Sequence, residues 1–320
     1  GLTAFPTAYC LLPTAYCLLP YSPLAIRYSP HMTSYLFTPA SSPRKIARAL
    51  ASEADWVILD LEDSVTAADK DMARMAAAEA LRLRPAGGPR IMVRVNALDS
   101  GLVDADLDAV APAAPDAIML PKAMGGDDAQ QLSVKLAVRE AEAGLEDGAI
   151  GVVPLCAESS ASLFRMGGYR GATGRLVGLA WGAEDLAADI GARVTRLPSG
   201  DFTPPFALAR SLTLHAAAAA GVPAIDAVYP NFRDAAGLRA ECAAARRDGF
   251  AGKLAIHPDQ AAIIREAMAP SDAEIARARA IEAAFAAAPG AGALALDGGM
   301  IDAAHLRWAR RILAQAAPRG

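Results

Sequence analysis

Three carboxylates lie within four positions at the end of an apolar run, in the segment VILDLEDSV at residues 57–65. They belong to Asp60, Glu62 and Asp63. Acids that are packed together repel one another, and burial adds to the cost of their charge. A metal ion, a cationic side chain or solvent at the end of a strand must therefore compensate them, and the choice among these bears on function.

Other apolar runs of the chain are followed by polar residues of similar kinds. These are Arg94, Asn96, Lys122, Glu158, Glu184, Asp185 and His257. Together with the three acids above, they form a set in which one arginine and one lysine stand among six carboxylates. A divalent cation would balance this excess of negative charge. Carboxylate oxygens completed by water or substrate suit Mg²⁺ or Mn²⁺ better than Zn²⁺, and no Cys/His cluster has zinc spacing.

Each of these residues alone also has a structural interpretation. Asp60 can cap a turn, Arg94 can pair with a neighbouring acid, and Glu184 and Asp185 suit the start of a helix because acids there favour its dipole. The prediction of a functional site depends on their coincidence at strand ends. Cys156 lies beside this set, but no histidine is near it in sequence to serve as a base, so we expect it in the core.

The elements that must position these residues are short apolar runs alternating with Ala-rich helical stretches. Most runs are continuous rather than alternating, as in parallel strands buried on both faces. The predicted strands cover 34–38, 56–61, 90–96, 116–121, 149–155, 175–181, 224–229 and 252–257, and helical patterns between them include 43–53, 69–84, 127–143 and 234–248. This succession predicts a (β/α)8 TIM barrel, with the polar residues at the carboxyl ends of its strands. A doubly wound sheet is the alternative, since sequence alone does not show closure.

The two ends of the chain differ from this pattern. The heptapeptide TAYCLLP occurs twice in succession at 7–20, YSP also recurs, and His31-Met32 resembles a cloning junction, so we interpret 1–31 as vector-derived or disordered. The barrel is then the catalytic domain, at 32–268. Residues 269–320 form a helical appendix: a helix at 270–288, a glycine-rich link, and a last helix near 302–315. The appendix either packs on the barrel or acts as a mobile lid.

Composition excludes several classes of function. The net charge of −4 and the lack of a basic run argue against a nucleic-acid partner. No apolar stretch is long enough to span a membrane, and four cysteines, two of them near the N-terminus, do not make a disulfide framework. We expect a cytoplasmic protein.

A series of motifs carries a family resemblance. In order they are SYLFTPASSPRKIARAL, ADWVILDLEDSVTAADK, IMVRVN, IMLPKA, LVGLAWGAEDLAADIGA and DGFAGKLAIHPDQ. From Ser34 to about Leu313 the chain resembles the citrate lyase β-subunit-like family of the HpcH/HpaI aldolase superfamily. The resemblance implies a (β/α)8 barrel in a trimer or hexamer. It also implies Mg²⁺-dependent cleavage or formation of C–C bonds in 3-hydroxyacyl thioesters such as malyl-CoA, citramalyl-CoA and citryl thioesters.

The resemblance assigns roles to individual residues. Glu158 and Asp185 would be the metal ligands, Arg94 would hold the thioester or enolate oxygen, and Asp302 in the appendix would transfer the proton. Substrate or CoA contacts would come from Phe37, Arg48, Arg94, Glu158, Glu184, Ile256 and His257. The supporting residues would be Asp60, Glu62, Asp63, Lys70 and Lys122, with the three acids accepting hydrogen bonds from metal-bound water and pairing with either lysine.

Some positions depart from the family pattern. TPA replaces the usual VPG, Ser42 stands where an arginine commonly follows, and ESSAS replaces ETxxG. These departures affect the expected contacts to the CoA phosphates rather than the metal site.

The expected reaction is a Claisen-type cleavage of a 3-hydroxyacyl-CoA into a 2-oxo acid and acetyl- or propionyl-CoA, or the reverse condensation. Four alternatives stay open at this stage. They are a malyl-CoA thioesterase, the β subunit of a citrate lyase complex, an aldolase that acts on free 2-oxo acids, and a non-catalytic subunit. The sequence does not choose among the acyl groups.

Overall fold

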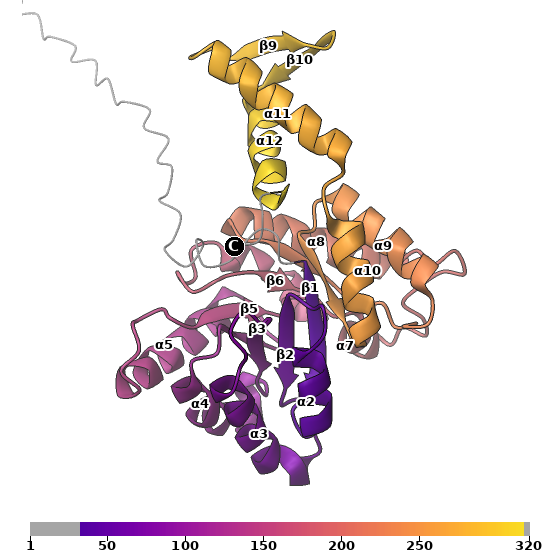
Figure 1. Cartoon of the computed structure of the whole chain (residues 1–320). Helices are drawn as coiled ribbons and strands as arrows, with labels where there is room; N and C mark the ends of the chain where they lie inside the picture. Colours follow the sequence, from indigo (N-terminus) through magenta and orange to yellow (C-terminus); the bar gives the residue numbers. More distant parts are fainter. Residues whose placement is uncertain (1–32, 317–320) are drawn as a thin grey trace, which may run out of the picture.

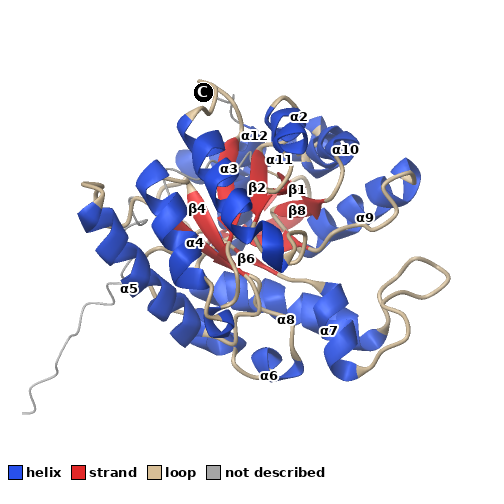
Figure 2. Ribbon diagram, turned by 90° about the horizontal axis from the view of Figure 1, so that it is seen from below, coloured by secondary structure: helices blue, strands red, loops and turns tan. Residues whose placement is uncertain are grey.

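Eight short parallel strands form the centre of the fold, and helices surround them (Figures 1 and 2). The computed structural model describes residues 33–316. The strands are β1 (Ser34–Pro39), β2 (Trp56–Asp60), β3 (Arg90–Arg94), β4 (Ala117–Leu120), β5 (Gly151–Pro154), β6 (Leu179–Ala180), β7 (Ala224–Asp226) and β8 (Gly252–Ala255). Each lies within or over one of the eight predicted runs, because continuous apolar segments fit strands that are buried on both faces.

The strand order closes the sheet into a barrel. Neighbouring strands follow the order β5-β4-β3-β2-β1-β8-β7-β6. Isolated bridges between Val152 and Leu176 and between Leu155 and Ala180 then join β5 to the β6 segment. The TIM-barrel prediction is therefore confirmed, and the doubly wound alternative is excluded. β6 is shorter than the predicted 175–181 because Leu176, in the early part of that run, pairs with β5 only through an isolated bridge.

Two apolar layers hold the barrel together. The interior contains Tyr35, Trp56, Ile58, Met92 and Met119 among others, with Tyr35 stacked on Trp56. The second layer lies between the strands and the helices around them. These helices are α2 (Pro43–Leu50), α3 (Lys70–Arg82), α4 (Val103–Val110), α5 (Gly126–Glu142), α6 (Ser160–Leu163), α7 (Ala183–Ile190), α8 (Pro204–Ala220), α9 (Ala235–Asp248) and α10 (Pro258–Met268), with four short 3-10 turns at Ala67–Asp69, Leu98–Ser100, Ala111–Ala113 and Met166–Tyr169.

The C-terminal unit projects from the barrel (Figure 1). It consists of α11 (Asp272–Ala287), β9 (Ala293–Leu296), β10 (Gly299–Asp302) and α12 (Ala303–Ala316). It has a small core of its own, built from Ala278, Ile281, Ile301, Ala309 and Ile312. A unit with its own core can keep its shape without packing closely on the barrel.

The glycine-rich link expected between the two last helices is a β-hairpin, which corrects that expectation. β9 and β10 pair antiparallel across Asp297-Gly298. Both residues have positive φ, 51° and 77°, as two-residue hairpin turns require, and Asp-Gly is a typical sequence for such turns. The alternating leucines of ALAL before this turn point to the same structure.

Among the described residues, no helix combines the length and apolarity needed to cross a bilayer. The predicted vector-derived segment 1–31 lies outside the described residues.

Candidate active site

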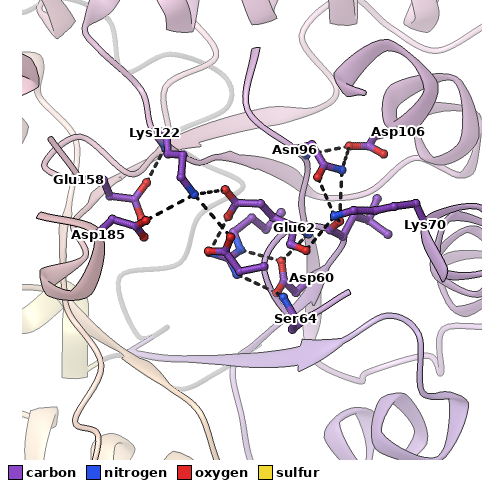
Figure 3. A network of polar contacts seen from close by, with 12 residues as sticks. Asp60, Glu62, Ser64, Lys70, Asn96, Asp106, Lys122, Glu158 and Asp185 are labelled. Atoms are coloured by element: carbon purple, nitrogen blue, oxygen red, sulfur yellow. Dashed lines mark hydrogen bonds and ion pairs between the residues drawn. The ribbon is translucent and has the colours of Figure 1, made fainter. Parts of the chain in front are cut away.

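Most of the predicted site residues meet where β2, β3, β4 and β5 end and α7 begins (Figure 3). In a barrel of parallel strands, these carboxyl ends share one face, and the loops that follow them build the active site. Figure 3 shows Lys122 between two groups of acids, with Glu158 and Asp185 on one side and Glu62 and Asp60 on the other. The chemistry of the site therefore depends on how these charges are paired.

Arg94 compensates the acids that end β2. The register of β2 and β3 places Asp60 beside Arg94, and the guanidinium donates from Nε and Nη2 to the two carboxylate oxygens of Asp60, each at 2.7 Å. Nη1 lies 2.9 Å from Glu62 Oε2 and 3.7 Å from Asp63 Oδ2. Burial favours the neutral acid, but the hydrogen bonds and charge of Arg94 prevail and hold the pKa of Asp60 below its usual value.

Lys122 provides the second cation of this cluster. Its ammonium donates to Glu62 Oε1 and lies 3.6 Å from Asp63 Oδ1 and 3.6 Å from Asp185 Oδ1. Although burial alone would lower its pKa, the hydrogen bond and charge of Glu62 raise it, so Lys122 stays protonated. For Glu62, burial outweighs Arg94 and Lys122, and its pKa is raised.

Of the two lysines expected as alternative partners of these acids, Lys122 forms the ion pairs and Lys70 makes other contacts. Its ammonium donates to the main-chain oxygens of Leu61 and Glu62, at 2.6 and 2.8 Å, and to Asn96 Oδ1 at 2.8 Å. The physical reason is its position at the start of α3, where it meets the carbonyls that follow β2. Lys70 thus fixes the chain that carries the acids rather than their side chains.

Glu158 and Asp185 form a second acidic pair. Glu158 is buried, and its Oε2 accepts the Lys122 backbone N–H at 2.5 Å. Burial, followed by the negative charges of Asp185 and Glu62, raises the pKa of Glu158 to about 8 despite that hydrogen bond. A Cβ added at Gly182 would lie 3.0 Å from Glu158 Oε1, so the glycine leaves the room that this carboxylate needs.

The donor set fits a hard divalent cation. No group of three or more His, Cys, Asp or Glu side chains in residues 33–316 is arranged to hold a metal by itself. The buried Glu158 and the partly exposed Asp185, whose charges repel each other, nevertheless match the way Mg²⁺ is bound, through one or two carboxylates with water and substrate completing the shell. Positive charge between Glu158 and Asp185 would relieve the cost that the raised pKa of Glu158 reveals.

The expected CoA contacts lie around the rim on other elements. Phe37 of β1 packs against the Arg94 guanidinium, 4.9 Å from its ring centre. Arg48 on α2 is exposed and lies 3.7 Å from Asp259. Ile256 is exposed, and His257 stacks on Phe232 with 4.9 Å between ring centres. Glu184 is exposed in the first turn of α7.

Asp302 is not brought to this cluster within one chain. It ends β10 in the projecting C-terminal unit (Figure 1). Its Oδ1 lies 2.8 Å from His305 Nδ1 and accepts the Ala304 N–H at 2.9 Å. The hydrogen bond with His305 lowers the pKa of Asp302.

Two polar networks were missed from the sequence. Asp106 accepts both the backbone and the side-chain N–H of Asn96, at 2.7 Å each, and so orients the amide that meets Lys70. On the outer face of the barrel, the buried Lys253 lies 2.6 Å from Glu241 and 3.3 Å from Asp226. A lysine inside the apolar run GKLAIH was the available signal, because a buried lysine needs an acidic partner.

Comparison with known proteins places this geometry in a family. The model of the HpcH/HpaI aldolase/citrate lyase family matches residues 33–258, and that of the C–C bond lyases of the TIM-barrel fold matches residues 212–320. The chain belongs to the HpcH/HpaI aldolase/citrate lyase family. It is a carbon–carbon lyase of the citrate lyase β-subunit-like type, as the motifs predicted.

Curated relatives match along most of their length. A citrate lyase subunit beta-like protein of Mycobacterium tuberculosis is 38% identical, covering 88% of this chain and 94% of the relative. The citrate lyase subunit beta of Escherichia coli is 35% identical, covering 88% and 92%. A (3S)-malyl-CoA thioesterase of Cereibacter sphaeroides is 34% identical, covering 88% and 94%. The family thus includes both C–C lyases and a thioesterase.

A solved structure matches with ligands present. It is the CitE protein of M. tuberculosis in complex with magnesium, acetoacetate and coenzyme A, which has a TM-score of 0.70 and 35% identity, covering 89% of this chain and 97% of that one. The citrate lyase beta subunit of M. tuberculosis complexed with oxaloacetate and magnesium has a TM-score of 0.63 and 34% identity, covering 77% and 99%.

Proposed function

We propose that this protein is a Mg²⁺-dependent lyase that cleaves a 3-hydroxyacyl-CoA thioester, such as malyl-CoA or citramalyl-CoA, or forms it by Claisen condensation. The products of cleavage are a 2-oxo acid and acetyl- or propionyl-CoA. The observation that carries this proposal is the Glu158–Asp185 pair beside the cation Lys122, which also binds Glu62, an acid that Arg94 contacts. The magnesium, 2-oxo acid and CoA ligands of the M. tuberculosis relatives support it.

Glu158 and Asp185 are the residues that would hold Mg²⁺, or Mn²⁺ in its place. Such an ion supplies Lewis acidity toward the hydroxyl and carboxylate oxygens of the substrate. The two side chains come from the segment after β5 and from the first turn of α7, so the barrel fixes them on neighbouring elements. Gly182 keeps the space beside Glu158 open.

Arg94 is the residue for the developing oxyanion. In cleavage, the substrate hydroxyl gives its proton to the Asp302 carboxylate, which can then return it to the enolate carbon. The bond between the carbinol carbon and the thioester α-carbon breaks as the carbinol carbon becomes the carbonyl of the 2-oxo acid, and the electron pair of that bond moves to the thioester oxygen. Asp60 engages two of the five N–H groups of Arg94, and Glu62 lies at ion-pair distance from Nη1. The remaining N–H groups can donate to that oxygen, and the paired acids hold the guanidinium in place.

The enolate carbon must then take a proton, and Asp302 is the proposed group. Its lowered pKa favours the carboxylate, which suits removal of the α-proton in the condensation direction. Because Asp302 stands apart from the site of its own chain, this role requires the C-terminal unit of a neighbouring subunit. We therefore propose a homo-oligomer, a trimer or hexamer, in which the unit acts as a lid.

Phe37, Arg48, Glu184, Ile256 and His257 are the proposed contacts to substrate and CoA. They surround the charged cluster on β1, α2, α7 and the end of β8. Arg48 is exposed and so can meet a phosphate. The cytoplasmic location expected from the sequence stays a prediction.

Two other functions are named for relatives of this chain. Hydrolysis to a free acid and CoA is the activity named for the C. sphaeroides relative, and the role of a citrate lyase β subunit is named for the E. coli relative. Incubating the protein with malyl-CoA, citramalyl-CoA and citryl-CoA in the presence of Mg²⁺ separates them. A 2-oxo acid with acetyl-CoA from malyl-CoA or citramalyl-CoA supports the proposal. The same kind of products from citryl-CoA alone supports the citrate lyase role, and malate with free CoA supports the thioesterase.

The metal assignment has its own test. Mn²⁺ binding to the Glu158→Ala variant is expected to be lost, because one of two carboxylate ligands is gone. The Glu184→Ala variant is a matched control in the same rim, since Glu184 is exposed and is not a proposed ligand. Equal Mn²⁺ affinity in wild type and Glu158→Ala would remove the centre of the proposal.

A further inference from the structure

Lys122 has an unusual backbone for a side chain of its size. Its φ is +52°, and only Ala114 and Asp297 share a positive φ among the non-glycine residues that the structure describes. This left-handed region costs an ordinary residue about 1 kcal/mol or more. Such strain persists only where the surrounding contacts require the conformation. Lys122 lies in the turn that follows β4, at the site rim.

This conformation gives Lys122 two contacts with the acidic pair at once. Its backbone N–H points at Glu158 and donates to Oε2 at 2.5 Å. Its side chain runs to the opposite side of the rim, donates to Glu62, and passes 3.6 Å from Asp185 Oδ1 (Figure 3). A single residue therefore fixes one proposed metal ligand through its amide and presents a positive charge to the other.

The two contacts act on a bound cation in opposite ways. The amide holds the Glu158 carboxylate in place, which favours coordination. The ammonium lies 3.6 Å from Asp185 Oδ1 and would repel a divalent cation bound by that carboxylate, because like charges that share one partly exposed carboxylate still interact by more than thermal energy. Lys122 is 40% exposed and Asp185 37% exposed, so solvent reduces this repulsion without removing it.

We propose that Lys122 is a positioning residue that weakens divalent-cation binding to the Glu158–Asp185 pair, so that tight binding depends on the added negative charge of the substrate carboxylate. This inference rests on the proposed function, because it takes Glu158 and Asp185 as the metal ligands. It adds that cation and acidic substrate bind to this site cooperatively. Glu62 and Asp63 are the residues that keep the ammonium in place.

The alternative is a purely structural Lys122 that only neutralises the acids around it. The two interpretations predict opposite changes in the affinity for a divalent cation when the charge of Lys122 is removed. If Lys122 were structural, removing its charge would disorder the carboxylates and weaken cation binding. If Lys122 opposes the cation, removing its charge strengthens binding in the absence of substrate.

The test is a titration with Mn²⁺, followed by electron paramagnetic resonance of the free ion, without substrate. The variant Lys122→Met removes the charge and keeps a long side chain, and Lys122→Arg keeps the charge. Lys122→Asn serves as a second uncharged variant, since asparagine tolerates a positive φ. We expect Kd for Mn²⁺ to fall on the order of tenfold in Lys122→Met and in Lys122→Asn, and to stay near the wild-type value in Lys122→Arg.

An unchanged or higher Kd in both uncharged variants, or no measurable Mn²⁺ binding in any of the proteins, would overturn the inference. Adding oxaloacetate or malate as the acidic probe should tighten Mn²⁺ binding to wild type more than to Lys122→Met, and equal effects would also contradict it. The Mn²⁺ titration can fail or succeed independently of the product assay that tests the proposed function. A protein that hydrolyses malyl-CoA instead of cleaving it can still show tighter Mn²⁺ binding in Lys122→Met.

Discussion

Replacing Glu158 by glutamine should change how stability depends on pH in protein stripped of metal by a chelator. Burial and the neighbouring charges of Asp185 and Glu62 raise the pKa of Glu158 from its ordinary value of 4.5 to about 8. Between about pH 4.5 and about pH 8, the folded protein therefore keeps a proton on this carboxyl that the unfolded chain has released. The glutamine side chain has nearly the same shape and cannot ionise, so the variant lacks this effect.

The sign and size follow from linkage. Because the folded pKa exceeds the unfolded one, the stability that the protonated carboxyl contributes is complete below about pH 4.5 and is lost as the pH rises to about 8. Such a shift corresponds to about 5 kcal/mol at most, and relaxation or water entry reduces it, so we expect a loss of about 2 to 5 kcal/mol in wild type relative to Glu158→Gln.

Urea denaturation of both proteins at about pH 5 and about pH 9, in excess chelator, measures this difference. Subtracting the free energy of unfolding of the variant from that of wild type cancels the contributions that the two proteins have in common. Glu184→Gln, at an exposed position in the same rim, is the matched control. Its free energy of unfolding should change between the two pH values by the same amount as that of wild type. If the free energy of unfolding changes by the same amount between the two pH values in wild type and in Glu158→Gln, burial and the neighbouring charges do not raise the pKa of this carboxyl.

Three further substitutions test other parts of the account. Arg94→Lys keeps a positive charge but loses the fork that meets Asp60, so kcat in the thioester cleavage assay should fall about 100- to 1000-fold; a value near wild type would exclude the oxyanion role. Gly182→Ala brings a Cβ to 3.0 Å from Glu158 Oε1, so it should weaken Mn²⁺ binding about tenfold. The free energy of unfolding should change by only about 1 kcal/mol. An unchanged Mn²⁺ affinity would show that Glu158 does not need the space beside Gly182. Lys253→Met removes the buried cation that Asp226 and Glu241 share, while Arg210 stays beside Asp226 and Arg196 beside Glu241. The free energy of unfolding in urea should fall by about 3 kcal/mol, because a buried pair loses one partner. A loss under about 1 kcal/mol would show that Lys253 is not needed for stability.

The barrel could be predicted because its signal is local. Each strand is a short run of apolar residues buried on both faces, as in β2, where all five residues are buried. The polar residues after these runs fall on one face because parallel strands end together. An apolar run does not show how many of its residues pair with the neighbouring strands. β6 is therefore shorter than the apolar run that predicted it, because part of that run pairs only through an isolated bridge.

The pairing of charges could not be predicted from sequence, because it depends on register and side-chain direction. Asp60 meets Arg94 because the register of β2 and β3 sets them side by side. Lys70 meets carbonyl oxygens and Asn96 rather than the acids because of where α3 begins. The left-handed backbone of Lys122 has no signature in the sequence LPKA, yet it determines how that residue contacts both acidic groups.

The hairpin in the C-terminal unit was predictable and was missed. Asp297-Gly298 between alternating apolar residues is a strong local signal, but the surrounding glycines and alanines favoured the interpretation as a link. The distance of Asp302 from the charged cluster is different in kind. It follows from the direction in which the C-terminal unit projects from the barrel, which no local pattern of residues describes.

The most direct test of the central claim is product analysis after incubation of the purified protein with malyl-CoA and Mg²⁺, by mass spectrometry of both the acid and the thioester. The account predicts glyoxylate and acetyl-CoA in equal amounts, with little product after the metal is removed by a chelator or in Arg94→Lys. Hydrolysis alone would contradict it: malate with free CoA from malyl-CoA, the corresponding free hydroxy acid with free CoA from the other hydroxyacyl thioesters, and no 2-oxo acid from any of them.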